Sequence, residues 1–108
     1  MNFSDRIEIW TCTLIRTATG HTAGPWTLLR VVWGRVIPLS VSNQVKFQQR
    51  GHAQVTDEIV VGGALEFQLD DATTKTQFRC DGQAYRPLEV GQKSGRRGSM
   101  RIPVLEVA

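Results

Sequence analysis

The sequence lacks the signatures of several large protein classes. It has no CxxC pair, which excludes a zinc ribbon, and its two cysteines, Cys12 and Cys80, stand far apart. No apolar run approaches the ~18 residues of a membrane-spanning helix, and the first residues show no signal-peptide pattern. We therefore expect a protein made and used inside a cell, or packaged into a particle assembled there, with no membrane contact. Both cysteines sit in apolar-alternating runs and are predicted to be buried free thiols, with a single disulfide as the alternative.

The charge excess is also small. The chain has 13 basic and 10 acidic residues among 108, a net charge of +3, whereas a dedicated duplex-DNA-binding protein usually concentrates more positive charge on one element. Asp70 and Asp71 form a local acidic spot, and the last third of the chain is basic through Arg79, Arg86, Lys93, Arg96, Arg97 and Arg101. A hydrophobic share of 41% is typical of a globular protein, and the length predicts one domain over residues 1–108.

Apolar residues recur with a period of two along most of the chain, and no long helix is predicted. The expected strands cover residues 6–14, 26–39, 54–61, 64–69, 75–80, 83–90 and 100–107. The side chains expected in the core from the later strands are Phe78, Cys80, Tyr85, Leu88 and Val90. About seven short strands separated by turn residues predict an all-β fold, a small antiparallel barrel or sandwich.

Local irregularities can also be predicted. The apolar parity switches after Ile9, which indicates a bulge or a strand covered on both faces. The long strand over residues 26–39 should bend near Gly34. Residues 17–25 and 91–99 are expected as loops, the latter flexible and basic. Turns are expected at Gly62–Gly63, at 70–72 and, as a tight turn, at Asp81–Gly82.

The segment over residues 40–53 differs in kind, because it is polar, rich in glutamine and poor in aliphatic residues. Ser42 could cap a short helix over 43–50 that stops at Gly51, and an extended projecting loop is equally compatible. A compact domain seldom carries so long a loop without a use for it. The side chains that suit water, polar partners or DNA phosphate are Ser42, Asn43, Gln44, Lys46, Gln48, Gln49, Arg50 and His52.

The residue types that usually carry catalysis are not arranged for it. His21 and His52 have no Cys, Asp or Glu at metal-ligand spacing. Asp57 and Glu58 are strand neighbours, which point to opposite faces and so would not share a site. We expect no enzymatic activity, metal or cofactor. A small hydrolase in which a histidine and a carboxylate meet only in space is a minor alternative.

A basic cluster and the tryptophans are the remaining candidates. Lys93, Arg96, Arg97 and Arg101 are predicted as phosphate or partner contacts, against the simpler interpretation of a solvated hairpin tip. No aromatic residues are interleaved with them, so a base-stacking surface is not indicated there. Of the three tryptophans, at positions 10, 26 and 33, two are expected in the core, and one at a subunit interface is the functional alternative.

The order of these features resembles the head-tail joining proteins of tailed bacteriophages, also called head-closure or stopper proteins. The matching pieces are Arg6 to Ile9, Val32 to Ser40, Asn43 to Ile59, Asp81 to Val90 and the closing Glu106–Val107. The chain departs from the family at Gly62–Gly63, where a basic-aromatic strand end is common. Its long segment also lacks the acidic residue and the alanines often found there.

The resemblance implies a viral structural protein of the virion, a β-barrel subunit of the head–tail connector assembled in the bacterial host cytoplasm. About six or twelve copies would form a homo-oligomeric ring below the portal and adaptor proteins and above the tail proteins. The ring would extend the DNA channel, and residues 42–52 would face it and help retain double-stranded DNA without reading its sequence. The alternative from another class is a nucleic-acid-binding barrel of the OB or SH3-like type, which would use Lys93, Arg96, Arg97 and Arg101.

Overall fold

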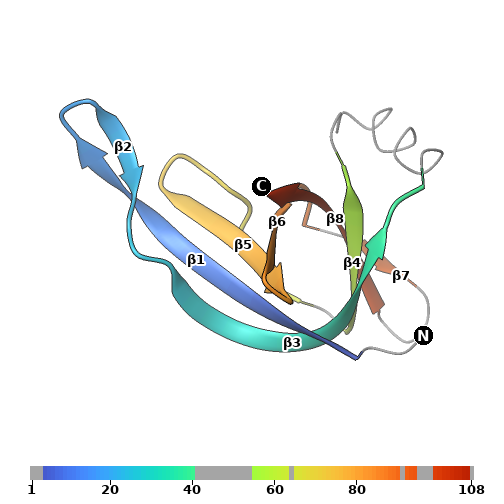
Figure 1. Cartoon of the computed structure of the whole chain (residues 1–108). Helices are drawn as coiled ribbons and strands as arrows, with labels where there is room; N and C mark the ends of the chain where they lie inside the picture. The colour runs from blue at the N-terminus through green and yellow to red at the C-terminus, as the bar shows by residue number, and fades with distance from the viewer. Residues whose placement is uncertain (1–3, 41–54, 64, 91, 95–98, 108) are drawn as a thin grey trace.

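A computed structural model describes residues 4–40, 55–63, 65–90, 92–94 and 99–107, and over these residues the chain is all-β (Figure 1). The strands are β1 (Asp5–Thr17), β2 (Gly20–Ala23), β3 (Thr27–Pro38), β4 (Asp57–Gly62), β5 (Thr74–Cys80), β6 (Gln83–Pro87), β7 (Gln92–Ser94) and β8 (Ser99–Val107). The predicted fold class is therefore confirmed. The segment over residues 40–53 lies outside the described residues, apart from Ser40.

Six of the strands form a closed antiparallel barrel. The hydrogen-bonded order is β1, β3, β4, β8, β6 and β5, and β5 pairs back onto β1. Closure pairs most of the sheet edges, which otherwise invite pairing with other chains. Two short strands stand outside the circuit, since β2 pairs with β1 and β7 pairs with β8.

The barrel core is built from the inward positions of these strands. Its members are Ile7, Ile9, Ile59, Val61, Leu65, Phe78, Cys80, Tyr85, Met100, Ile102 and Val104. Phe78 is fully buried and meets Phe67 edge-on, with ring centroids 5.1 Å apart. The prediction that Phe78, Cys80 and Tyr85 point inward is confirmed. Val90 is not in the core, because β6 ends at Pro87 and leaves Val90 53% exposed.

Gly34 is the position at which β3 changes partner. It lies opposite Asp5 of β1 and opposite Val61 of β4. A Cβ atom there would lie 2.5 Å from the Val60 carbonyl oxygen and 2.9 Å from Ile7 Cδ1, so a side chain does not fit. The bend expected near Gly34 thus coincides with a close approach of three strands.

The first strands form one long hairpin that projects from the barrel (Figure 1). The predicted loop over 17–25 is wrong, because Gly20–Ala23 pairs with Leu14–Thr17 of β1. The predicted irregularity after Ile9 is confirmed as a register shift. Ile9 lies opposite Arg30 and Trp10 opposite Leu28, which leaves Leu29 without an opposite residue. Such a bulge increases strand twist and turns the extra side chain outward.

Three further sequence predictions can be compared with the tertiary structure. Residues 65–69 form no strand, because both edges of the preceding β4 are already paired, with β3 and with β8. The predicted loop over 91–99 contains β7 and the start of β8. The turn at Asp81–Gly82 is confirmed, and both residues have positive φ, at 50° and 78°, as a type I′ hairpin turn requires.

Candidate interaction surface on β1, β3 and β5

All three tryptophans lie outside the buried core. Trp33 is 59% exposed, and Trp10 and Trp26 are partly buried. The expectation that two of them fill the core is therefore wrong. Because Ile7 and Ile9 of β1 point inward, the alternate position Trp10 points outward. Trp33 lies opposite Arg6, which shares that outward parity.

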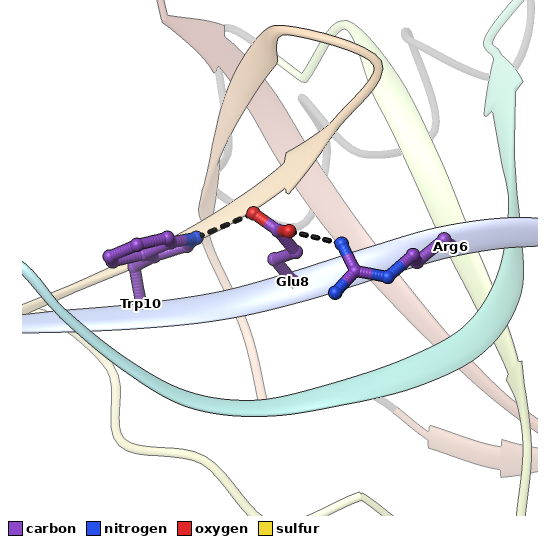
Figure 2. Close-up of polar contacts among 3 residues, drawn as sticks. All are labelled: Arg6, Glu8 and Trp10. Carbon is purple, nitrogen blue, oxygen red and sulfur yellow. Dashed lines mark hydrogen bonds and ion pairs between the residues drawn. The ribbon is translucent and has the colours of Figure 1, made fainter.

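A row of polar contacts runs along the outer face of β1 (Figure 2). Glu8 accepts a hydrogen bond from Trp10 Nε1, with a nitrogen–oxygen distance of 3.0 Å, and its other oxygen forms an ion pair with Arg6. The indole hydrogen bond and then the Arg6 guanidinium lower the pKa of Glu8 below its usual value, since both favour the carboxylate. The row thus presents a fixed negative charge between a cation and an aromatic ring.

Arg79 of β5 extends this row to the neighbouring strand. Its guanidinium carbon lies 4.6 Å from the centroid of the Trp10 ring and 5.3 Å from that of Trp26, so it stacks on both. Arg79 Nε also donates to Gln77 Oε1 at 3.1 Å. Arg6, Glu8, Gln77 and Arg79 line an open groove of about 500 Å³. The contacts hold both tryptophans in place against the barrel.

The neighbouring strand β3 supplies the apolar part of this surface. Leu28, Leu29 and Trp33 are 41%, 60% and 59% exposed. Over residues 27–33, β3 pairs with β1 along one edge, and it pairs with β4 only from Gly34 onward. Within the described part of the chain, its other edge over 27–33 therefore has no strand partner. Exposed leucines and a tryptophan beside an unpaired strand edge are typical of a surface that another protein covers.

The outer face comprises Arg6, Glu8 and Trp10 of β1, Leu28, Leu29 and Trp33 of β3, and Gln77 and Arg79 of β5. The open edge comprises the backbone of residues 27–33. The outer face thus combines charged, hydrogen-bonding and apolar side chains.

Two described nucleophile candidates, Cys80 and Tyr85, lie elsewhere, and their pKa values are shifted toward the protonated form. Burial raises the pKa of the Cys80 thiol, and burial together with Asp57 raises that of Tyr85. Cys12 and Cys80 are both free and buried, as predicted. Among the residues that the structure describes, no three His, Cys, Asp or Glu side chains gather into a metal-binding group.

The structure describes few of the site residues predicted from the sequence. The eight residues proposed to line a channel, within 42–52, and the basic pair Arg96 and Arg97 lie outside the described residues. The backbone of Lys93 lies in β7 beside Met100, one register position from Arg101. Arg101 itself is engaged, because its Nη1 donates to Glu58 Oε1 at 3.0 Å.

The outer face was not anticipated from the sequence, although part of its signal was there. Arg6, Glu8 and Trp10 alternate with Ile7 and Ile9, which places them on one side of a strand. Nothing local, however, shows that Arg79 of β5 lies across from Glu8. That contact depends on the pairing of strands about seventy positions apart.

The comparisons with known proteins support the fold alone. No protein-family model matches this sequence, and no curated protein matches it significantly. The chain is similar in structure to the solution structure of protein SF1141 from Shigella flexneri 2a, with a TM-score of 0.71 and 17% identity. The match covers 100% of this chain and 98% of that one, so the whole fold is shared. No helix in the described residues is long and apolar enough to cross a membrane.

Proposed function

We propose that this chain is a non-enzymatic structural subunit of a bacteriophage head–tail connector, the class that the order of its sequence features resembles. One observation carries the proposal that it works in an assembly. Over residues 27–33, β3 pairs with β1 along one edge, but in the described part of the chain its other edge has no strand partner, next to exposed Leu28, Leu29 and Trp33. A monomeric protein usually protects such an edge, whereas a subunit can leave it for its neighbour.

The proposed role follows from the resemblance and from the polar segment. Copies would form a ring that continues the DNA channel, with Ser42, Asn43, Gln44, Lys46, Gln48, Gln49, Arg50 and His52 toward the axis. Polar and basic side chains in a channel contact phosphates and carry no sequence preference. Portal or adaptor proteins on one side and tail proteins on the other would cover the remaining surfaces of the ring.

Cryo-electron microscopy of particles that contain this protein tests the proposal. We expect its density as a ring between head and tail, with residues 42–52 toward the channel. Matched particles made without the gene should lose that ring and release their DNA. Density for the chain anywhere else in the particle, or particles that keep the ring without the gene, would overturn the connector role.

Binding of single-stranded nucleic acid is the second candidate, because the outer face combines tryptophans with arginines. Bases stack on exposed aromatic rings in such proteins. Arg79, however, already stacks on Trp10 and Trp26, and of the three rings Trp33 is the most exposed. Titration of the tryptophan fluorescence with an oligonucleotide at low salt distinguishes the two: we expect no saturable quenching, and quenching lost in Trp33→Ala would favour this candidate.

A further inference from the structure

We infer that copies of this chain associate head to tail, with the open edge of one copy against the acidic loop over residues 65–73 of the next. The inference rests on the proposed ring and names the two surfaces that would build it. A ring of identical subunits needs two different, complementary surfaces on each copy. The structure offers two such surfaces, which differ in charge and lie on opposite sides of β1.

The open edge is the first surface. Leu28, Leu29 and Trp33 are exposed there, and the bulge at Leu29 turns that side chain outward without an opposite residue. Arg30 on this edge is exposed, and so is Arg35 just beyond it, where β3 is already paired with β4. Among the described residues this edge has no strand partner, so it combines backbone hydrogen-bonding groups, apolar side chains and positive charge, which together fit a partner with apolar and acidic groups.

Acidic and basic residues are unevenly distributed along the chain, which supports the pairing of the open edge with the acidic loop. Residues 9–56 contain no Asp or Glu and five basic residues, whereas seven of the ten acidic residues fall within 57–89. On the described surface, Arg30 and Arg35 stand on the basic side, and Glu66, Asp70 and Asp71 on the acidic side are all exposed. Opposite charge on two surfaces of one molecule favours association of unlike surfaces over like ones.

The acidic loop is the second surface, and the fold places it across β1 from the open edge. β3 and β5 flank β1 (Figure 1), and the loop runs along the β5 side. Its backbone is held there, because Asp71 N donates to the Thr74 carbonyl at 3.0 Å and Asp70 Oδ1 accepts from Thr76 N at 2.9 Å. Phe67 and Leu69 of the loop are half-buried and could contact the partner's apolar side chains.

A two-fold pairing of β3 with β3 is the competing arrangement between copies. Pairing over 27–33 with the two-fold axis at Arg30 would place the two Arg30 side chains opposite each other, which is unfavourable for like charges. It would also leave the acidic loop uncovered. Head-to-tail pairing brings opposite charges together and repeats from copy to copy, as ring closure demands.

Complementary charge reversal tests the inference, with sedimentation velocity of the full chain over a concentration series. The first variant, R30E with R35E, loses the basic surface, and the second, E66K with D70K, loses the acidic one. We expect wild-type protein to self-associate reversibly, less so as salt rises, and each variant alone to associate at least about tenfold more weakly. An equal mixture should recover self-association beyond a dimer, because the reversed edge of the first variant fits the reversed loop of the second, and the unchanged loop of the first fits the unchanged edge of the second.

Other outcomes overturn the inference. The first is a wild-type chain that stays monomeric at every concentration. The second is an E66K/D70K variant that associates like wild type. The third is a mixture that stays monomeric although both variants melt like wild type. Because Asp70 accepts a backbone hydrogen bond, E66K alone is the fallback if the double variant fails to fold. Cryo-electron microscopy separates this inference from the proposed function, since a head–tail ring built through other surfaces would overturn only the inference.

A matched pair of apolar substitutions tests the other component of the surface. Leu29→Lys places a charge in the open edge, and Val90→Lys places the same charge at a similarly exposed apolar site, 60% against 53% exposed. We expect the first to weaken self-association about tenfold and the second to leave it unchanged. Equal effects of the two substitutions would contradict the role of the edge.

Discussion

Side chains on the outer face contact one another through a hydrogen bond, an ion pair and cation–π stacking. Glu8 binds Trp10 and Arg6, while Arg79 stacks on Trp10 and Trp26. Each contact is exposed or only partly buried and contributes little alone, but together they restrict the rotamers of two large aromatic side chains. A surface whose side chains are already ordered loses less entropy when a partner binds.

The ionisation of Glu8 gives a measurable sign of this network. Its pKa is lowered in the folded protein, so its stabilising contribution is present above the usual value of 4.5 and is lost as pH falls through the folded pKa. We expect an NMR titration of the Glu8 carboxyl to have a midpoint below 4.5. In Trp10→Phe the midpoint should rise, because the largest cause of the shift is removed.

Asp71 provides the internal control for that titration. Its pKa is lowered by the backbone N–H groups of Thr73 and Thr74, which do not involve Trp10. The Asp71 midpoint should therefore be the same in Trp10→Phe and in wild type. A Glu8 midpoint that does not move in the variant would contradict the hydrogen bond as its main cause.

At the scale of elements, the long hairpin has two different environments. The β1 segment that carries Ile7 and Ile9 lies in the barrel, with β3 on one edge and β5 on the other. The Leu14–Thr17 segment pairs with β2, whose four residues are all exposed. A two-stranded ribbon without a core is only marginally stable, so the barrel holds this arm in place.

Two truncations should separate these environments. Phe78→Ala removes a fully buried ring and should lower the free energy of unfolding by about 3–5 kcal/mol. Ile15→Ala removes a side chain that is 50% exposed on the arm and should change it by less than about 0.5 kcal/mol. Urea unfolding followed by circular dichroism measures both. A large loss in Ile15→Ala would show that the arm contributes to the cooperative core.

For the molecule as a whole, barrel closure makes folding depend on contacts distant in sequence. β1 must meet β5, and β4 must meet β8, before the circuit is complete. Cys12 lies on β1 and Cys80 on β5, and they are 2% and 7% exposed. Because both side chains are buried, access to either thiol requires the segment around it to open.

The two thiols should report that opening. In the native protein we expect both to react slowly with a thiol-specific reagent, at rates that follow global unfolding as urea is added. The fully denatured chain, in which both react at once, is the control. Rapid reaction of Cys12 alone in the native state would instead reveal local opening of the β1 segment next to the arm.

The sequence alone determined the local features of this protein. Period-two alternation predicted the strands, Asp81–Gly82 predicted a tight turn, and the parity switch after Ile9 predicted the bulge, because each depends on neighbouring residues. The tertiary structure decided what depends on distant pairing. Residues 65–69 have strand-like composition, yet β3 and β8 already occupy both edges of β4, so these residues form no return strand. The position of the tryptophans outside the core and the contact of Arg79 with Trp10 also depend on the pairing of distant strands. Both are therefore visible only in the closed barrel.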